Sequence, residues 1–85
     1  MKSFTHVIKD PLGLHARPAG LLVKAASGFS SAVSITAPTG KADAKRIMAV
    51  MRLAAKQGME LTISCEGADE EAAAAALQKF CEESL

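Results

Sequence analysis

The sequence predicts an α+β fold with the element order βαββαβα, in which helices back an antiparallel sheet. Three segments place apolar residues at helical spacing, and four segments alternate apolar with polar residues at a period of two. Such alternation suits a sheet covered on one face only, because strands covered on both faces are continuously apolar. The 85 residues, 49% of them hydrophobic, are expected to form a single domain over residues 1–85 around one shared core.

The first strand is predicted over residues 4–8 and the first helix over residues 16–27. Between them, the turn-forming run of residues 10–13 breaks the strand. Gly28 follows the helix and is expected to end it in a left-handed conformation. The inward-facing positions are expected to be Phe4, His6 and Ile8 in the strand, and Ala19, Leu22, Val23 and Ala26 in the helix.

A hairpin is predicted next, from a strand over residues 33–37, a tight turn over residues 38–40 and a weaker strand over residues 41–44. The second helix is predicted to begin at Ile47 and to end before residues 57–58, where Gly58 supplies a stop signal. Along this helix we expect Ile47, Val50 and Ala54 to face the core, Met48 to point outward, and Met51 to serve either side.

The last strand is predicted over residues 61–65, and the last helix after Asp69, a residue suited to capping its first turn. Glu70 and Glu71 in that turn suit the positive end of the helix dipole. The apolar face of this helix is predicted to consist of Ala73, Ala76, Leu77 and Phe80.

The composition argues against nucleic-acid and membrane binding. The net charge is +1, and neither sign forms a long block along the chain. Trp and Tyr are absent and the three Phe residues are spaced like core residues, so the stacking platform of an RNA-binding sheet is missing. Neither a secretory signal nor an apolar run of about 20 residues is present. We therefore expect a cytoplasmic protein that does not insert into membranes.

The cysteines and histidines do not have the spacing of a metal site. Cys65 and Cys81 lie in a predicted strand and a predicted helix without a CxxC pattern, and are expected to be buried, reduced thiols. His6 is expected to be a partly buried, hydrogen-bonded strand residue, and together with His15 it provides no zinc-ligand spacing. No glycine-rich phosphate loop is present. We expect neither a metal nor a cofactor.

The unusual segment is residues 13–19, GLHARPA. Pro18 is well tolerated only in the first turn of a helix, so the helix must begin within a residue or two of His15. The first backbone N–H groups of a helix lack intrahelical acceptors and attract anions, and the Arg17 guanidinium matches phosphate oxygens. The N–H groups expected to be available are those of Ala16, Arg17 and Ala19.

A histidine at this position is suited to accept a phosphoryl group. The positive field of the helix terminus favours the neutral ring, in which one nitrogen keeps a lone pair and can act as a nucleophile. The same field would stabilise the anionic product, and Gly13 would permit a close approach of the backbone at this turn. On spacing alone, His15 could instead be a plain helix cap beside a solvated Arg17, although histidine is not a preferred capping residue.

The segment GLHARPA resembles that of HPr, the histidine-containing phosphocarrier of the bacterial phosphoenolpyruvate-dependent sugar phosphotransferase system. The resemblance extends over essentially the whole chain, and residues 45–51, KRIMAVM, resemble the family's second-helix signature. It implies an open-faced sandwich of four antiparallel strands with three helices on one face. It also implies that Nδ1 of His15 takes a phosphoryl group from phosphorylated enzyme I and passes it to enzyme IIA domains, with Arg17 and the N–H groups of Ala16 and Arg17 steadying it.

The resemblance further implies that both partners dock on one apolar surface. We expect a carrier without turnover of its own, and a monomer, because it must expose one face to several partners. The residues of that surface would be Leu14, Ala16, Gly20, Ile47, Met48 and Met51.

Two positions depart from the family pattern. Arg46 opens the second helix, where many Gram-positive members have a serine that a regulatory kinase phosphorylates, so control through that site is not expected. Leu12 replaces a small polar residue, which predicts a less polar phosphoryl pocket and an altered phosphohistidine lifetime.

Two other readings share parts of this pattern. A regulatory paralogue of the nitrogen-related branch would use the same His15 chemistry. A small acylphosphatase would bind phosphate through an arginine and backbone amides, but would need no nucleophilic histidine.

Overall fold

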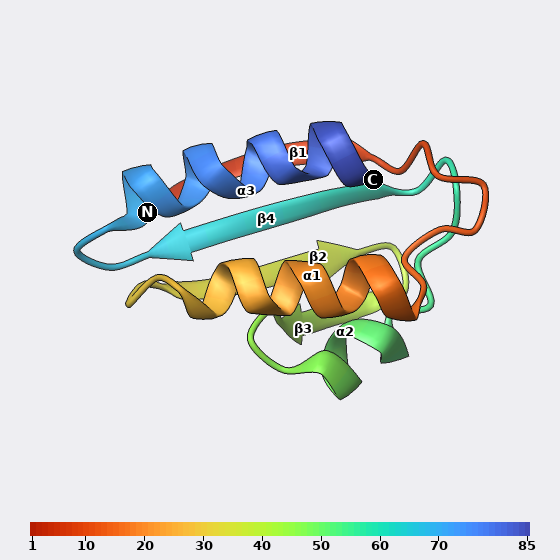
Figure 1. Ribbon diagram of the computed structural model, residues 1–85, viewed down its shortest axis with the longest axis horizontal. Coiled ribbons are helices and arrows are strands. Elements are labelled where there is room, and N and C mark those ends of the chain that lie inside the picture. The colour runs from red at the N-terminus through yellow and green to blue at the C-terminus, as the bar shows by residue number, and fades with distance from the viewer.

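The computed structural model describes residues 1–85 and has the predicted order βαββαβα (Figure 1). The elements are β1 (Lys2–Val7), α1 (Ala16–Ser27), β2 (Ala32–Ala37), β3 (Gly40–Asp43), α2 (Ile47–Arg52), β4 (Glu60–Glu66) and α3 (Glu70–Ser84).

The four strands form one sheet in the order β1-β4-β2-β3, and every neighbouring pair is antiparallel. In Figure 1, α1 and α3 lie side by side in front of the sheet, and α2 lies beside β3. The predicted α+β class and the open-faced sandwich are therefore confirmed.

The core lies between the sheet and the helices. Phe4 and His6 of β1 pair with Ile63 and Leu61 of β4, which are fully buried, so the inward face of β1 is the predicted one. Apolar side chains from the central strands and the two long helices complete the core, each contributing about 1.5–3 kcal/mol when fully buried. The largest fully buried apolar side chains are Ile8, Leu22, Ile35, Val50, Leu61, Ile63 and Leu77.

The end of α1 differs from the prediction. Gly28 is not left-handed but has φ −73°, and its N–H donates to the Ala25 carbonyl at 3.2 Å. Phe29 donates in the same manner to Ala26, also at 3.2 Å. The last turn therefore tightens into i→i+3 hydrogen bonds, which satisfy terminal carbonyls without a left-handed residue.

Helix α2 is shorter than predicted and turns a different face inward. Val50 and Leu53 are buried, whereas Ala54 is exposed and Ile47 is 37% exposed, so placing Ile47 and Ala54 in the core was wrong. The helix stops early because Ala54 is left-handed with φ 47°, and Thr39 Oγ1 donates to the Leu53 carbonyl at 2.5 Å.

Gly58 has the expected positive φ of 90°, but it does not end α2, which already stops at Arg52. Its N–H donates to the Ile8 carbonyl at 2.9 Å, in the segment that leads into β4.

The buried face of α3 is Ala73, Leu77 and Cys81, with Phe80 half-buried, whereas the predicted Ala76 is exposed. Cys65 and Cys81 are both buried, as predicted. Burial raises the pKa of both thiols, that of Cys81 to about 12. Neither sulfur therefore has the exposed, thiolate-favouring surroundings that a reactive cysteine needs.

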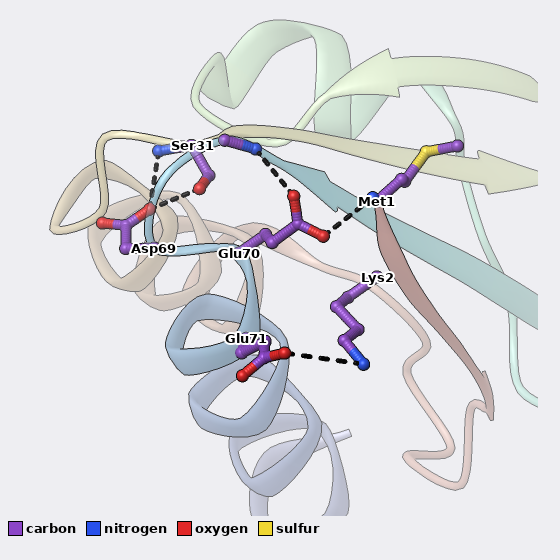
Figure 2. A network of polar contacts seen from close by, with 7 residues as sticks. Met1, Lys2, Ser31, Asp69, Glu70 and Glu71 are labelled. Atoms are coloured by element: carbon purple, nitrogen blue, oxygen red, sulfur yellow. Dashed lines mark hydrogen bonds and ion pairs between the residues drawn. The ribbon is translucent and has the colours of Figure 1, made fainter.

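Asp69 occupies the N-cap position of α3, but its carboxylate makes no cap hydrogen bond, contrary to the prediction. It accepts a hydrogen bond from the Ser30 N–H at 2.9 Å. It also accepts from the Ser31 N–H at 2.9 Å and from the Ser31 hydroxyl (Figure 2). These donors, with the Ser31 hydroxyl as the largest cause, lower the pKa of Asp69 to about 2. The carboxylate thus ties the start of β2 to the start of α3.

Glu70 connects the N-terminus to the same region. Its carboxylate lies 2.8 Å from the Met1 ammonium and accepts a hydrogen bond from the Gly67 N–H at 3.3 Å, which lowers its pKa (Figure 2). Beside it, Lys2 and Glu71 are 3.8 Å apart. This polar network lies at one end of the molecule, whereas the start of α1 lies at the other (Figure 1).

Candidate functional site

His15 is the N-cap residue of α1, as the position of Pro18 predicted. Its backbone is extended, with φ −90° and ψ −177°, and its side chain is 37% exposed. The imidazole makes no capping hydrogen bond, so interpreting this side chain as a plain helix cap is wrong. The ring is left available at the surface.

Two backbone N–H groups beside His15 have no acceptor. Those of Ala16 and Arg17 donate to no group of the protein, and the buried Pro18 has no N–H to donate. The N–H of Ala19 is occupied, because it donates to the His15 carbonyl at 2.9 Å, so its predicted availability is wrong. The first turn of α1 therefore presents two N–H groups, together with the exposed Arg17 side chain, to an anion.

The loop before His15 is fixed by Gly13, which is buried and has φ +68°. A Cβ at Gly13 would lie 2.4 Å from the Ala55 carbonyl oxygen, so the predicted close approach at this turn is confirmed. The N–H of Leu14 donates to the same Ala55 oxygen at 2.9 Å. The segment after α2 therefore holds the loop that carries His15.

A shallow depression of about 340 Å³ brings His15 and Arg17 together with residues that the sequence did not point to. Asp10 approaches the ring, with its Oδ2 at 3.5 Å from His15 Nε2. The C-terminal end of α3 also reaches this place, because the N–H groups of Lys9 and Asp10 donate to the Leu85 carbonyl at 2.5 and 3.1 Å. The lining residues are Asp10, His15, Arg17, Pro18, Leu21 and Ser84.

Leu12 does not line this depression. Its side chain is 74% exposed, and its N–H donates to Asp10 Oδ1 at 2.9 Å. The predicted effect of Leu12 on the polarity of the phosphoryl pocket therefore loses its structural basis.

Exposed apolar side chains lie on α1 and α2, which contact each other. Met48 is 66% exposed, as predicted, and Met51 is 40% exposed. Leu14 is only 5% exposed and belongs to the core, so it supports the loop and offers little contact area. Leu21, 46% exposed, was missed, although its place one residue before Leu22 indicates an outward position. We call Ala16, Gly20, Leu21, Ile47, Met48 and Met51 the apolar surface.

The net charge of +1 conceals a separation of charge. Residues 11–59 contain seven Lys and Arg and one Asp, a net charge of +6, whereas residues 60–85 contain seven Asp and Glu and one Lys, a net charge of −6. The first group forms α1, β2, β3 and α2, and the second forms β4 and α3, on the opposite side of the molecule (Figure 1). The apolar surface therefore lies in the basic half.

The rest of the molecule offers little chemistry. A larger depression of about 960 Å³ lies over β2, β3 and β4, lined mainly by Ser, Thr, Ala, Lys and acidic side chains and by neither histidine. No three His, Cys, Asp or Glu side chains gather to hold a metal ion. None of the helices has the length and apolar character to cross a membrane.

Known proteins resemble this chain over nearly its whole length. Residues 2–83 match the family model PTS-HPr, described as "PTS HPr component phosphorylation site". The phosphocarrier protein HPr of Mycoplasma genitalium is 45% identical over 83 residues, which cover 96% of this chain and 94% of the relative. The solved structure of a mycoplasma histidine-containing phosphocarrier protein superimposes with a TM-score of 0.94 at 41% identity, covering 98% of this chain and 94% of that one.

An HPr from Thermoanaerobacter tengcongensis, solved as a dimer, is 46% identical with a TM-score of 0.77, covering 98% of this chain and 95% of that one. The family model thus spans nearly the whole chain, and the two solved structures share both fold and sequence with it. The chain belongs to the HPr family, the phosphocarrier proteins of the phosphoenolpyruvate-dependent phosphotransferase system.

Proposed function

We propose that this phosphocarrier holds its phosphoryl group on Nδ1 of His15. The observation that carries the proposal is the position of the imidazole at the start of α1, beside the unpartnered N–H groups of Ala16 and Arg17. A surface ring with no capping hydrogen bond, next to donors that have no acceptor, suits reversible attachment of an anion.

In the proposed transfer, the Nδ1 lone pair of His15 attacks the phosphorus atom carried by phosphorylated enzyme I. An N–P bond forms at His15, and the bond between phosphorus and the donor breaks, its electron pair returning to the donor. Negative charge on the transferred group is stabilised by the N–H groups of Ala16 and Arg17 and by the Arg17 guanidinium. The reverse sequence delivers the group to an enzyme IIA domain.

Both partners are proposed to dock on the apolar surface around His15. Its exposed methionines on α2 adapt well to more than one partner, and their unbranched side chains pack against differing shapes. We propose that the protein acts as a monomer in the cytoplasm, because one exposed face must serve several partners in turn. Sedimentation at working concentration would test this, since a stable dimer would contradict it.

Arg46 lies at the edge of this surface. It is the N-cap residue of α2, its side chain is 80% exposed, and its Nε lies 4.0 Å from Asp43 Oδ2. A contact this long and exposed contributes little, so the guanidinium remains available to an acidic group on a partner. We expect Arg46→Ser to weaken enzyme I binding and reduce its salt dependence, measured by calorimetry at two salt concentrations. Unchanged affinity at both would contradict this role.

The decisive experiment is incubation with phosphoenolpyruvate and enzyme I, followed by phosphorus NMR. The parent protein is expected to acquire one acid-labile phosphoimidazole, and His15→Ala none. His6→Gln is the matched control, because it removes the other histidine and should be labelled fully. Labelling of His15→Ala would refute the proposal.

Arg17→Ala is expected to slow phosphorylation by about 10²-fold or more, the usual effect of losing one donor to a developing negative charge. Steady phosphate release from acyl phosphates, without enzyme I, would instead indicate an acylphosphatase.

A further inference from the structure

The geometry points to Asp10 as a positioning residue for phosphoryl transfer, one that holds the proton of the His15 ring on Nε2 and leaves the lone pair on Nδ1. This inference rests on the proposed function of His15 and deepens it by assigning a task to the opposite side of the ring. Its basis is the approach of Asp10 Oδ2 to within 3.5 Å of Nε2.

Asp10 is held on three sides by its own loop and by the end of the chain. Its N–H donates to the Leu85 carbonyl at 3.1 Å, and its carbonyl accepts from the Gly13 N–H at 2.9 Å. Its Oδ1 accepts from the Leu12 N–H at 2.9 Å. The backbone and Oδ1 of Asp10 are thus occupied by hydrogen bonds, and Oδ2 is the oxygen that lies near the His15 ring.

The contact determines which nitrogen carries the proton. A neutral imidazole has one N–H group and one acceptor nitrogen, whereas an ionised carboxylate only accepts. The approach is therefore attractive when Nε2 bears the hydrogen and repulsive when Nε2 presents its lone pair. The favoured tautomer leaves the Nδ1 lone pair unprotonated, as attack on phosphorus requires.

The same carboxylate also faces the charge that appears during transfer. When the Nδ1 lone pair forms the N–P bond, the Nε2 hydrogen stays in place and the ring gains positive charge. At 3.5 Å the Oδ2–Nε2 separation is longer than a usual N–H···O hydrogen bond. Such contacts commonly shorten when charge develops, and a neighbouring carboxylate stabilises an imidazolium that is held in this orientation.

The variant Asp10→Asn separates the effect of Asp10 on the His15 tautomer from its effect on the shape of the loop. The asparagine keeps Oδ1 as the acceptor for the Leu12 N–H, but turns an NH₂ donor toward Nε2 and so favours hydrogen on Nδ1. We expect nitrogen-15 NMR to show Nε2–H as the main neutral tautomer of His15 in the parent and a shift toward Nδ1–H in the variant. The phosphorylation rate should fall by about 10–100-fold, the range found when an orienting partner is lost.

Asp10→Ser is the matched second variant. Its hydroxyl is still able to accept from the Leu12 N–H but is too short to reach the ring, so the tautomer preference should weaken without reversing. Because the tautomer is also measured in the parent, the inference is testable even if a variant folds poorly. A parent that mainly carries hydrogen on Nδ1 would overturn it.

The two proposals fail in different ways. If His15→Ala is still phosphorylated, the proposed function is refuted and the task of Asp10 falls with it. If His15 is the labelled residue but Asp10→Asn keeps the parent's tautomer and rate, only the inference about Asp10 is refuted. A variant that loses stability but keeps the tautomer shows a structural role alone and also refutes the inference.

Discussion

Replacing Gly13 by alanine should destabilise the fold and disturb the phosphorylation loop at once. The new Cβ would lie 2.4 Å from the Ala55 carbonyl oxygen and 2.9 Å from the Lys56 Cα, both of them backbone atoms. The left-handed conformation at φ +68° adds about 1–2 kcal/mol for a residue with a Cβ. Relieving the overlap adds about 1–3 kcal/mol, and weakening the hydrogen bond from Leu14 to Ala55 about 1 kcal/mol more.

These contributions overlap, because one backbone shift relieves the clash and stretches the hydrogen bond together. Alanine also restricts the unfolded chain, which stabilises the variant by about 0.4–1 kcal/mol and partly offsets these losses. The free energy of unfolding should therefore fall by about 2–5 kcal/mol, measured by urea denaturation with a common slope for parent and variant. The phosphorylation rate by enzyme I should fall as well, since the loop before His15 must move.

Gly20→Ala is the matched control. A Cβ at Gly20, within α1, meets no atom within 4 Å, so this variant should gain about 0.5–1 kcal/mol from better helix propensity. If Gly13→Ala instead stays within about 0.5 kcal/mol of the parent, the close contact between the two loops does not exist and the reasoning fails.

Three further predictions concern other parts of the fold. The buried Nε2 of His6 has no hydrogen-bond partner, contrary to the prediction of a hydrogen-bonded histidine. His6→Phe should therefore raise the free energy of unfolding by about 1 kcal/mol, and a lower value in urea denaturation would contradict this. The pKa of Asp69, lowered from 3.8 to about 2, favours the folded state above pH 3.8, and this stabilisation is lost as the pH falls toward 2. Asp69→Asn should therefore be less stable at neutral pH and lose less stability across that window, which acid titration followed by circular dichroism would show. Cys65 and Cys81 should react with a thiol reagent only at the rate of unfolding, and fast labelling of the native protein would disprove their burial.

The sequence predicted well where the local rules were strict. Pro18 restricted the start of the helix to within a residue or two of His15, and His15 is indeed the N-cap residue of α1. Strict alternation in β2 and β4 fixed which side chains face the core. These features depend on neighbours in sequence, so one sequence suffices to find them.

The features that were missed depend on contacts between distant segments. Asp10 looked like a strand breaker, and only its bonds to Leu85 and the loop bring it to the ring. The inward face of α2 was misassigned because a six-residue helix carries too little periodicity, and its stop at Ala54 breaks the rule that left-handed positions belong to glycine. Asp69 is a residue type that commonly caps helices, but its carboxylate instead accepts hydrogen bonds from Ser30 and Ser31, 39 and 38 residues away.

The opposed charges of the two halves give the molecule an electric dipole that runs across the strands of the sheet. The field of an acidic partner orients such a molecule before the two proteins make contact. The basic half, which contains α1 and α2, then faces the partner. The bias operates only while the Debye length is comparable to the molecular extents of 34 × 22 × 21 Å. In 0.1 M salt the Debye length is about 10 Å, so this orienting effect is already weakened. The association rate should therefore decline with ionic strength more steeply than the strength of the short-range contacts.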